Sequence, residues 1–365
     1  VPYHPEKVLH VEPRGVSGDD FVFILGYPGR TYRHRTSHYL EYELKLRMPW
    51  VADLYHRQIE TMKSMSEESR VIAIKHLSRI KSRSNVMKNY RGKLQGLKRI
   101  GRLNAKRKEE AELLAYIQAD SVREAKYGHV LAQIDSVYRD IAKQAPRNLI
   151  LDYMKRSVIG LYSAATVYEA ALERRKPDLE RLSAYMDRNF ERTRKGLLAN
   201  IKDYHPPTET RLLGDMLKKA HALPDVLEIP ALSSIRNPER WTDRTVEETH
   251  VWDEAWIHDA FAMPPEALEQ SGDPMIELAI ALYPEYEALR EQRREWNGAL
   301  DQLHAALLDV KQDWLGSDFI PDANRTLRLT YGHIRGYSRA DAVLHLAFTT
   351  LESILEKNTG EAPFD

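Results

Sequence analysis

The chain has 365 residues, of which 42% are hydrophobic and 30% are charged, enough to bury a sizeable core in one large or two ordinary domains. Its 54 basic and 54 acidic side chains cancel, so no net field would steer the whole molecule toward nucleic acid or an anionic membrane. The absence of cysteine excludes disulfides, thiolate nucleophiles and zinc–cysteine sites. No run of about 18 apolar residues is present, so no membrane span is predicted.

Residues 1–47 are predicted to be strand and loop, because Phe21–Leu25 is a short apolar run that glycines and a proline bring to an end. From Met48 onward apolar residues recur three to five positions apart, as on one face of a helix. Helices are predicted near 49–65, 67–103, 105–144, 147–174, 178–203, 208–222, 243–260 and 274–315, with Pro146, Pro177, Pro206, Pro207, Pro224, Pro230, Pro238, Pro264 and Pro265 marking their ends. Thr208 is a predicted N-cap, and Thr245 is predicted to form a capping box with Glu248.

The chain returns to β structure after Gly316. Residues 325–331 alternate polar and apolar side chains, the period of a half-buried strand. A lone strand cannot satisfy its own edges, so this strand and the one near residue 21 are predicted to share a sheet that sequence outside this chain completes. The chain begins with Val and lacks a signal peptide, so both of its ends are expected to be cuts in a longer protein.

Familiar catalytic motifs are missing from the sequence: there is no GxSxG, P-loop, GxGxxG or HExxH pattern. Ser17, which lies between glycines, is interpreted as part of a turn. His250, Glu254 and His258 would share one helical face if the predicted helix is continuous, and could then hold a single transition metal. We favour a solvated or packed face. Glu247 and His250 also have the ExxH spacing of a carboxylate-bridged metal site in a helical bundle, but such a site needs a second ExxH motif, which is missing.

The strongest local charge feature is residues 70–108, which contain fourteen Lys or Arg and no acidic residue. Such a stretch could neutralise nucleic-acid phosphates, and a helical nucleic-acid-binding or scaffold protein is the alternative interpretation of the whole chain. Against it, the stretch has apolar residues at helical spacing and few aromatic residues, and acidic runs such as 247–259 could face it within the fold.

Two asparagines within the basic stretch, Asn85 and Asn89, lie four residues apart on one predicted helical face. Asparagine is a weak helix former, so a pair in mid-helix calls for a reason: a cap, a kink, a surface position or a binding role. Two further polar segments lie where a predicted strand meets a loop, where they could line a ligand site or simply form turns. Their residues are Gly26, Tyr27, Pro28, Gly29, Arg30 and Thr31, and Asp322, Ala323, Asn324, Arg325, Thr326, Leu327 and Arg328.

These segments together resemble the bacterial dipeptidyl-peptidase 7 and dipeptidyl-peptidase 11 family of serine exopeptidases, in order and spacing across essentially the whole chain. Gly272-Asp273-Pro274 is a fourth and weaker match. The resemblance implies a mainly α chain, with a large helical domain inserted between strands of a chymotrypsin-like double β-barrel. It divides the chain into barrel residues 1–47, helical domain 48–316 and barrel residues 317–365.

The resemblance also implies a function. The complete enzyme would remove dipeptides from the free amino terminus of oligopeptides by acyl transfer to a serine. The catalytic His, Asp and Ser would lie outside these 365 residues, so the chain alone is expected to be inactive. The helical domain would close the cleft and bind the substrate's amino group through Asn85, with Asn89 as second choice, and the loop residues above would serve as cleft or structural motifs.

The remaining expectations follow from the family alone. No metal and no organic cofactor is implied, and the expected partner is an oligopeptide with a free amino terminus, not nucleic acid. The family acts in the periplasm or at the cell surface, and the complete enzyme is expected to be a homodimer. Preference for acidic or for hydrophobic residues at the cleaved position is left open, because the residue that determines it lies downstream.

Overall fold

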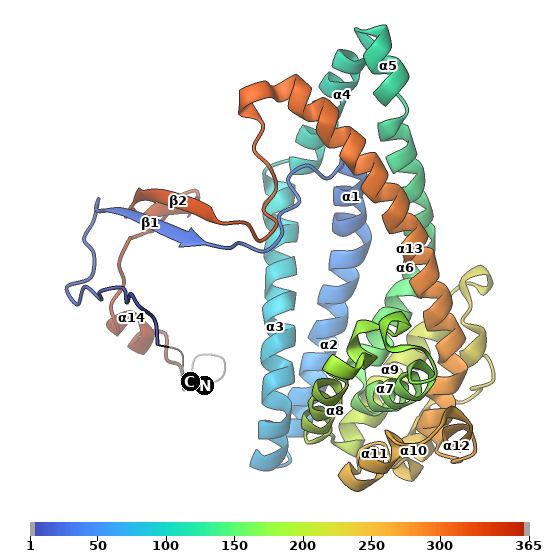
Figure 1. Cartoon of the computed structure of the whole chain (residues 1–365). Helices are drawn as coiled ribbons and strands as arrows, with labels where there is room; N and C mark the ends of the chain where they lie inside the picture. The colour runs from blue at the N-terminus through green and yellow to red at the C-terminus, as the bar shows by residue number, and fades with distance from the viewer. Residues whose placement is uncertain (1–3, 361–365) are drawn as a thin grey trace. The chain divides into compact units, whose positions relative to one another are not determined.

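The computed structural model describes residues 4–360, which form two units (Figure 1). Residues 35–319 form a helical unit, and residues 4–34 together with 320–360 form a smaller unit that contains the strands. The chain is therefore mainly helical, as predicted. The boundary was placed too late, however, because residues 37–47, expected as strand and loop, are already helical.

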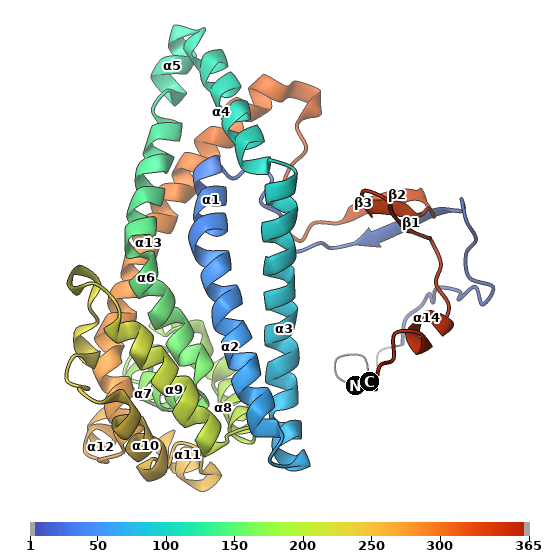
Figure 2. The same cartoon turned by 180° about the vertical axis from the view of Figure 1, so that it is seen from behind.

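The helical unit begins with α1 (Ser37–Tyr42), the π-helical turn η1 (Glu43–Arg47), α2 (Met48–Ser66) and α3 (Arg70–Arg99). It continues with α4 (Arg102–Gln118), α5 (Ser121–Tyr127), α6 (Val130–Ser157), α7 (Ile159–Glu173), α8 (Asp187–Ile201) and α9 (Pro206–His221). It ends with α10 (Pro238–Glu248), α11 (Glu254–Ala260), α12 (Pro265–Glu269) and the long α13 (Pro274–Leu315). Helices α2 and α3 run side by side, and α13 passes along α6 (Figures 1 and 2).

Helix α7 is the centre of the main hydrophobic core. Apolar residues occupy every side of it, which is the pattern of a helix surrounded by other elements, and nearly all of its residues are buried. Gly160, near its start, permits a close approach: a Cβ there would lie 3.2 Å from the Met275 side chain and 3.4 Å from the ring of Tyr204. A second apolar cluster joins α4, α5 and α6 to the C-terminal half of α13.

The prolines expected to mark helix ends lie between helices or at their starts, as predicted, with Pro146 as the exception. Pro206, Pro238 and Pro265 lie at the start of α9, α10 and α12, where the missing N–H would have no intrahelical partner anyway. Pro146 and Pro284 lie inside α6 and α13. Burial of the neighbouring Ala145, Leu149 and Ile150 offsets the cost of a proline in α6.

Both predicted N-caps were wrong. Helix α9 begins at Pro206, so Thr208 lies inside its first turn, and Thr245 lies within α10, whose N-cap is Asn237. The predicted helix over 243–260 is interrupted after Glu248 and resumes at Glu254. The stretch 105–144 is likewise divided, between α4, α5 and α6.

The smaller unit contains the two predicted strands, β1 (Phe21–Gly26) and β2 (Arg328–His333), and they pair antiparallel with Phe21 opposite His333. The prediction that they share a sheet is confirmed. The expected half-burial of the second strand is not found, since Leu329 and Tyr331 are 58% and 70% exposed. Two short strands, β3 (Tyr337–Ala340) and β4 (Val343–His345), form a separate hairpin, and α14 (Glu352–Leu355) follows.

Buried carboxylates from distant helices or loops accept hydrogen bonds from the free backbone N–H groups at the starts of several helices. Glu209 of α9, which is fully buried, accepts hydrogen bonds from Ile159 N at 2.5 Å and Gly160 N at 3.3 Å, the first residues of α7. Glu110 of α4 accepts from Ser37 N at the start of α1. Each carboxylate satisfies donors that a helix leaves unpaired and interacts favourably with the positive end of the helix dipole.

We predict that Glu209→Ala lowers the free energy of unfolding by about 3–5 kcal/mol, because it leaves the start of α7 and the Arg79 guanidinium without their buried counter-charge. Chemical denaturation followed by circular dichroism measures the change. Glu247→Ala, an exposed position on α10, is the control and should shift stability by no more than about 0.5 kcal/mol. Equal stability of the two variants would contradict a capping role for Glu209.

Candidate functional site

One face of α3 carries a polar stripe formed by Ser78, Ser82, Asn85 and Asn89. All four side chains share a helical face by their spacing, and all four are exposed. Among residues 4–360, the side-chain amides of Asn85 and Asn89 have no hydrogen-bond partner. Neither asparagine caps or kinks α3, and both occupy surface positions.

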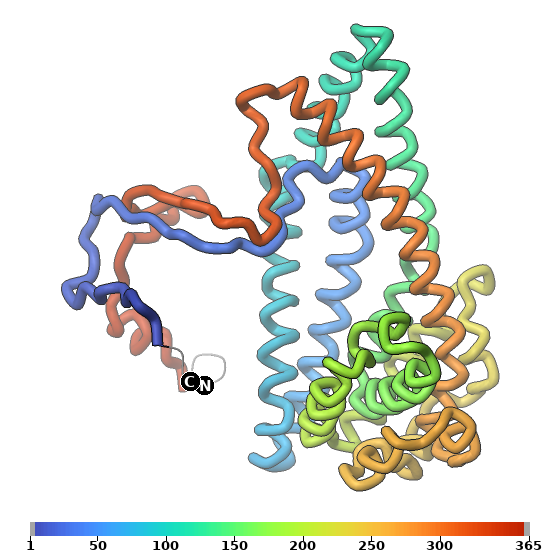
Figure 3. Tube along the Cα trace, viewed as in Figure 1, coloured from blue at the N-terminus to red at the C-terminus, as the bar shows by residue number. Residues whose placement is uncertain are grey.

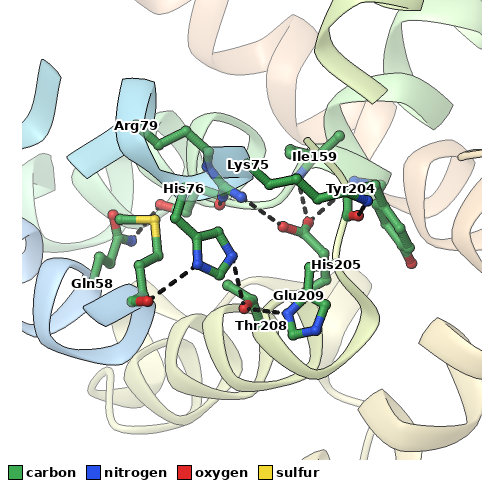
Figure 4. Close-up of polar contacts among 12 residues, drawn as sticks. Gln58, Lys75, His76, Arg79, Ile159, Tyr204, His205, Thr208 and Glu209 are labelled. Atoms are coloured by element: carbon green, nitrogen blue, oxygen red, sulfur yellow. Dashed lines mark hydrogen bonds and ion pairs between the residues drawn. The ribbon is translucent and has the colours of Figure 1, made fainter. Parts of the chain in front are cut away.

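The neighbouring face of α3 is fixed to the rest of the helical unit by a buried polar cluster (Figure 4). Arg79 donates to the Glu209 carboxylate at 3.0 Å and to the carbonyl oxygen of Ser157, at the end of α6. Lys75 donates to the carbonyl oxygen of Tyr204 at 2.9 Å. These bonds determine which face of α3 is left open for the stripe.

Two histidines and a threonine extend this cluster. His76 lies 3.1 Å from the carbonyl oxygen of Met62 through Nδ1 and 3.1 Å from Thr208 Oγ1 through Nε2. Thr208 Oγ1 is in turn 2.8 Å from His205 Nδ1. All contacts are satisfied if His205 donates to Thr208, Thr208 donates to His76, and a neutral His76 donates to Met62.

The electrostatics of the cluster favour neutral His76. Burial lowers the pKa of this fully buried imidazole, and the cations Arg79 and Lys75 lower it further, against the opposing effect of the Met62 carbonyl. Burial also lowers the pKa of His205. The unfolded chain therefore binds protons at these histidines more tightly than the folded chain does.

We predict that the stability gained by keeping His76 neutral is fully present above pH 6.5, the ordinary pKa of histidine. This contribution to the free energy of unfolding is lost as the pH falls toward the lowered pKa of His76. Urea denaturation at pH 8 and pH 5.5 measures the loss. In His76→Gln the loss between the two pH values should be smaller, whereas His56→Gln, at an exposed position, should keep the full dependence. The same dependence in all three proteins would exclude His76 as its source.

A cavity of about 540 Å³ adjoins the stripe, with Ser78 and Ser82 in its wall. Tyr55 of α2, the junction of α6 and α7, and Asn200 and Asp203 at the end of α8 complete the lining. Burial raises the pKa of Asp203. Three arginines also line the cavity: Arg79, Arg83 and Arg156.

Arg83 is the most unusual residue of the cavity. Only 7% of it is exposed, yet its guanidinium donates to the Ser157 carbonyl oxygen at 3.3 Å and to Met62 Sδ at 3.4 Å and forms no ion pair within the described part of the chain. Desolvation lowers its pKa to about 9. Nothing in the sequence indicates this burial, because Arg83 is one of many basic residues in the 70–108 stretch.

The predicted loop residues Gly26, Tyr27, Pro28, Gly29 and Arg30 meet Asp322, Asn324 and Arg325 in the smaller unit, in an arrangement that we call the clasp. Arg30 and Asn324 form an isolated antiparallel bridge, and Arg325 N donates to the carbonyl oxygens of Pro28 and Gly29. Figure 3 shows the chain leaving β1 and the chain entering β2 side by side. Arg325 has a φ of 69°, which is uncommon for a residue with a Cβ.

The carboxylate of Asp322 holds the clasp together. It accepts hydrogen bonds from Thr31 Oγ1 at 2.6 Å, from Arg33 N at 2.7 Å and from His34 N at 3.2 Å. Although burial acts in the opposite direction, these hydrogen bonds lower the pKa of Asp322. These hydrogen bonds join the two loops to each other. Asn85 and Asn89 belong to the helical unit.

We predict that Asp322→Ala accelerates amide hydrogen exchange at Arg33 and His34, because both N–H groups lose their acceptor, and lowers the free energy of unfolding by about 1–3 kcal/mol. Exchange measured by mass spectrometry on peptides covering residues 27–36 checks the first effect. Asp318→Ala, at an exposed position, should leave exchange in that segment unchanged. Unaltered exchange in Asp322→Ala would show that other contacts hold the clasp.

The basic stretch finds carboxylate partners inside the helical unit, though not the predicted ones. Arg79 pairs with Glu209, Lys106 with Glu109, Arg107 with Glu41 and Lys108 with Glu112. The acidic run 247–259 contributes to none of these pairs. Part of the positive charge predicted from the sequence is therefore compensated locally.

His250, Glu254 and His258 do not share a helical face, because the chain between α10 and α11 is not helical. His250 lies 3.7 Å from Asp273, whereas His258 contacts Arg194 at 2.7 Å. No cluster of three or more His, Asp or Glu side chains with metal-binding geometry occurs within residues 4–360. Over the same residues, no helix is both long and apolar enough to cross a membrane.

Gly272-Asp273-Pro274, the weak fourth match, forms the start of α13. Gly272 adopts a φ of +67°, and Asp273 Oδ1 accepts from Met275 N at 2.9 Å as an N-cap, with Pro274 in the first helical position. Asp273 Oδ2 also accepts from His250 N at 2.7 Å. The motif is thus a helix start that also fixes the chain between α10 and α11.

Comparison with solved structures finds proteins with a similar fold. A crystal structure of Porphyromonas endodontalis DPP11 in complex with the dipeptide Arg-Glu superposes with a TM-score of 0.78 at 21% identity, covering all of this chain and 52% of that one. The mainly helical fold is the same in both proteins.

Sequence comparison then gives the family. The profile of Peptidase S46 matches residues 1–365, and the chain belongs to that family. An Asp/Glu-specific dipeptidyl-peptidase from Shewanella putrefaciens is 28% identical over all of this chain and 50% of its own length, and dipeptidyl-peptidase 7 from Capnocytophaga gingivalis is 26% identical over all of this chain and 51% of its own. The chain thus spans about half the length of these relatives.

Proposed function

We propose that this chain is the central part of a serine-type dipeptidyl-peptidase that removes dipeptides from the free amino terminus of oligopeptides. The match of all 365 residues to Peptidase S46, and the names of the relatives, support this assignment. Because the chain spans half of those relatives, we place the catalytic His, Asp and Ser in sequence outside it and expect the chain alone to be inactive.

We further propose that β1 and β2 belong to a chymotrypsin-like double β-barrel that additional sequence completes. The exposed apolar side chains of both strands support this part of the proposal: Phe23, Leu329 and Tyr331 are 60%, 58% and 70% exposed. A pair of strands with so many exposed apolar side chains is stable only when other elements cover it.

The proposed reaction is acyl transfer. A serine attacks the scissile carbonyl, a histidine takes its proton and returns it to the leaving amine, and backbone N–H groups stabilise the oxyanion. The helical unit would close the cleft two residues before the scissile bond and bind the substrate's amino group there. A closed cleft of this length releases dipeptides and excludes longer acyl fragments.

The observation that carries the proposal is the free side-chain amide of Asn85 on the exposed face of α3. Its carbonyl oxygen can accept one of the three hydrogens of an ammonium group, and Asn89, one turn further, is the second choice. The nearby Arg83 is buried and bonded to the end of α6, so it does not present its charge at the position of the amides.

We predict that Asn85→Ala in the complete enzyme lowers kcat/KM for a dipeptide substrate about ten- to hundredfold, the contribution of one hydrogen bond to a charged group. Steady-state kinetics with a fluorogenic dipeptide substrate measures the drop. Gln95→Ala, which removes another exposed amide from the same helix, should retain the unmodified rate.

A substrate with an acetylated amino terminus separates binding of the ammonium from a general loss of structure. It lacks the charged group, so Asn85→Ala and the unmodified enzyme should process it equally slowly. An unchanged kcat/KM for the free substrate in Asn85→Ala would overturn the assignment, and the same measurement on Asn89→Ala tests the second choice.

We also propose that the complete enzyme acts in the periplasm or at the cell surface and forms a homodimer. Membership of the Peptidase S46 family is the support for both points. Fractionation of cells that express the full reading frame, followed by sedimentation of the purified enzyme, tests them.

A further inference from the structure

The cavity beside the polar stripe holds more positive charge than its surroundings neutralise. Of its three arginines, Arg79 is paired with the buried Glu209. Arg83 and Arg156 form no ion pair with any residue from 4 to 360. Asp203 is the one carboxylate in the lining, so one uncompensated positive charge remains.

The burial of Arg83 makes this surplus significant. A guanidinium that is 7% exposed, and that is bonded only to carbonyl oxygens and a thioether, lacks the counter-charge that a buried cation normally has. Tyr55 lies beneath it at 5.9 Å, which orients the guanidinium plane but supplies no full negative charge. Desolvation lowers the pKa of Arg83, and the neighbouring Arg79 lowers it further, against the opposing effects of Tyr55 and Glu209.

The rest of the lining suits a small anion. Arg156, on the exposed side of the cavity, lies 5.6 Å from the ring centroid of Tyr153 and leaves its donors accessible. Ser78 and Ser82 supply hydroxyl donors from α3. Two guanidinium groups with hydroxyl donors are the combination that recognises carboxylate and phosphate oxygens.

A second cavity, of about 600 Å³, shares Arg156 and Tyr162 with the first, and its other cations all contact carboxylates. Lys155 and Arg290 both contact Glu169, and Arg293 pairs with Asp152. The second cavity provides a control position, Arg294, which pairs with Glu291.

We propose that the cavity lined by Arg83, Arg156, Ser78 and Ser82 is a binding site for a small oxyanion, either a peptide carboxylate or a free inorganic ion such as phosphate. The site lies within the helical unit and does not depend on the peptidase function proposed above. The bound oxyanion supplies the counter-charge that Arg83 lacks. The negative charge of Asp203 opposes oxyanion binding.

The test measures affinity by isothermal titration calorimetry on the full-length protein in low-chloride buffer at pH 7, with inorganic phosphate in one series and N-acetylglutamate amide in another. Arg156→Gln, at an exposed position, should weaken binding about tenfold, and Asp203→Asn should strengthen it, because it removes the opposing charge. Arg294→Gln should leave the affinity unchanged.

The outcomes separate the two sources of the anion. Binding of N-acetylglutamate amide alone identifies a peptide carboxylate, binding of phosphate alone identifies an inorganic ion, and binding of both supports a general oxyanion site. Failure of both ligands to bind, or equal affinities in Arg156→Gln, Asp203→Asn and the unmodified protein, would overturn the proposal. Asn85→Ala should retain oxyanion binding, so failure of the peptidase assignment and failure of this site are distinguishable.

Discussion

The helical unit depends on the placement of buried carboxylates on free backbone N–H groups. Glu209 of α9 is the central case. Its fully buried carboxylate accepts hydrogen bonds from the first backbone N–H group of α7 and from the guanidinium of Arg79 on α3. A helix surrounded by apolar neighbours has no water at its first turn, so its N–H groups need a partner from within the protein. The carboxylate meets that need and fixes three helices relative to one another.

The same solution occurs elsewhere in the chain. Glu110 accepts a hydrogen bond from the first N–H group of α1, and Asp273 accepts one at the start of α13. Asp322 accepts hydrogen bonds from the backbone N–H groups of Arg33 and His34. In the candidate site, the bond between Arg79 and Glu209 turns one face of α3 inward. The other face of α3 therefore points outward, and it carries the exposed Asn85 and Asn89.

Much of this organisation could be predicted from the sequence. Hydrophobic period distinguishes the helical stretch from its flanking strands, and the edge requirement of a lone strand correctly predicted that β1 and β2 pair. Partners far apart in the chain could not be predicted. Thr208 has the sequence features of an N-cap, but its hydroxyl bonds to His76, 132 residues away, and nothing local to Arg83 distinguishes it from the exposed lysines around it. Pro146 was misinterpreted because burial of its neighbours, a tertiary effect, outweighs the local cost of proline in a helix.

The clasp has a consequence for the order of folding. Asp322 and Arg33 are 289 residues apart in sequence, so joining them closes one of the longest loops that the chain can form. Closing such a loop from an unfolded chain carries a large entropy cost, which shrinks once the intervening residues have become compact. Helices α2 and α3 follow each other in sequence and pack together, so they can pair early. Loop-closure entropy therefore favours pairing of β1 and β2 after the helices between them have formed.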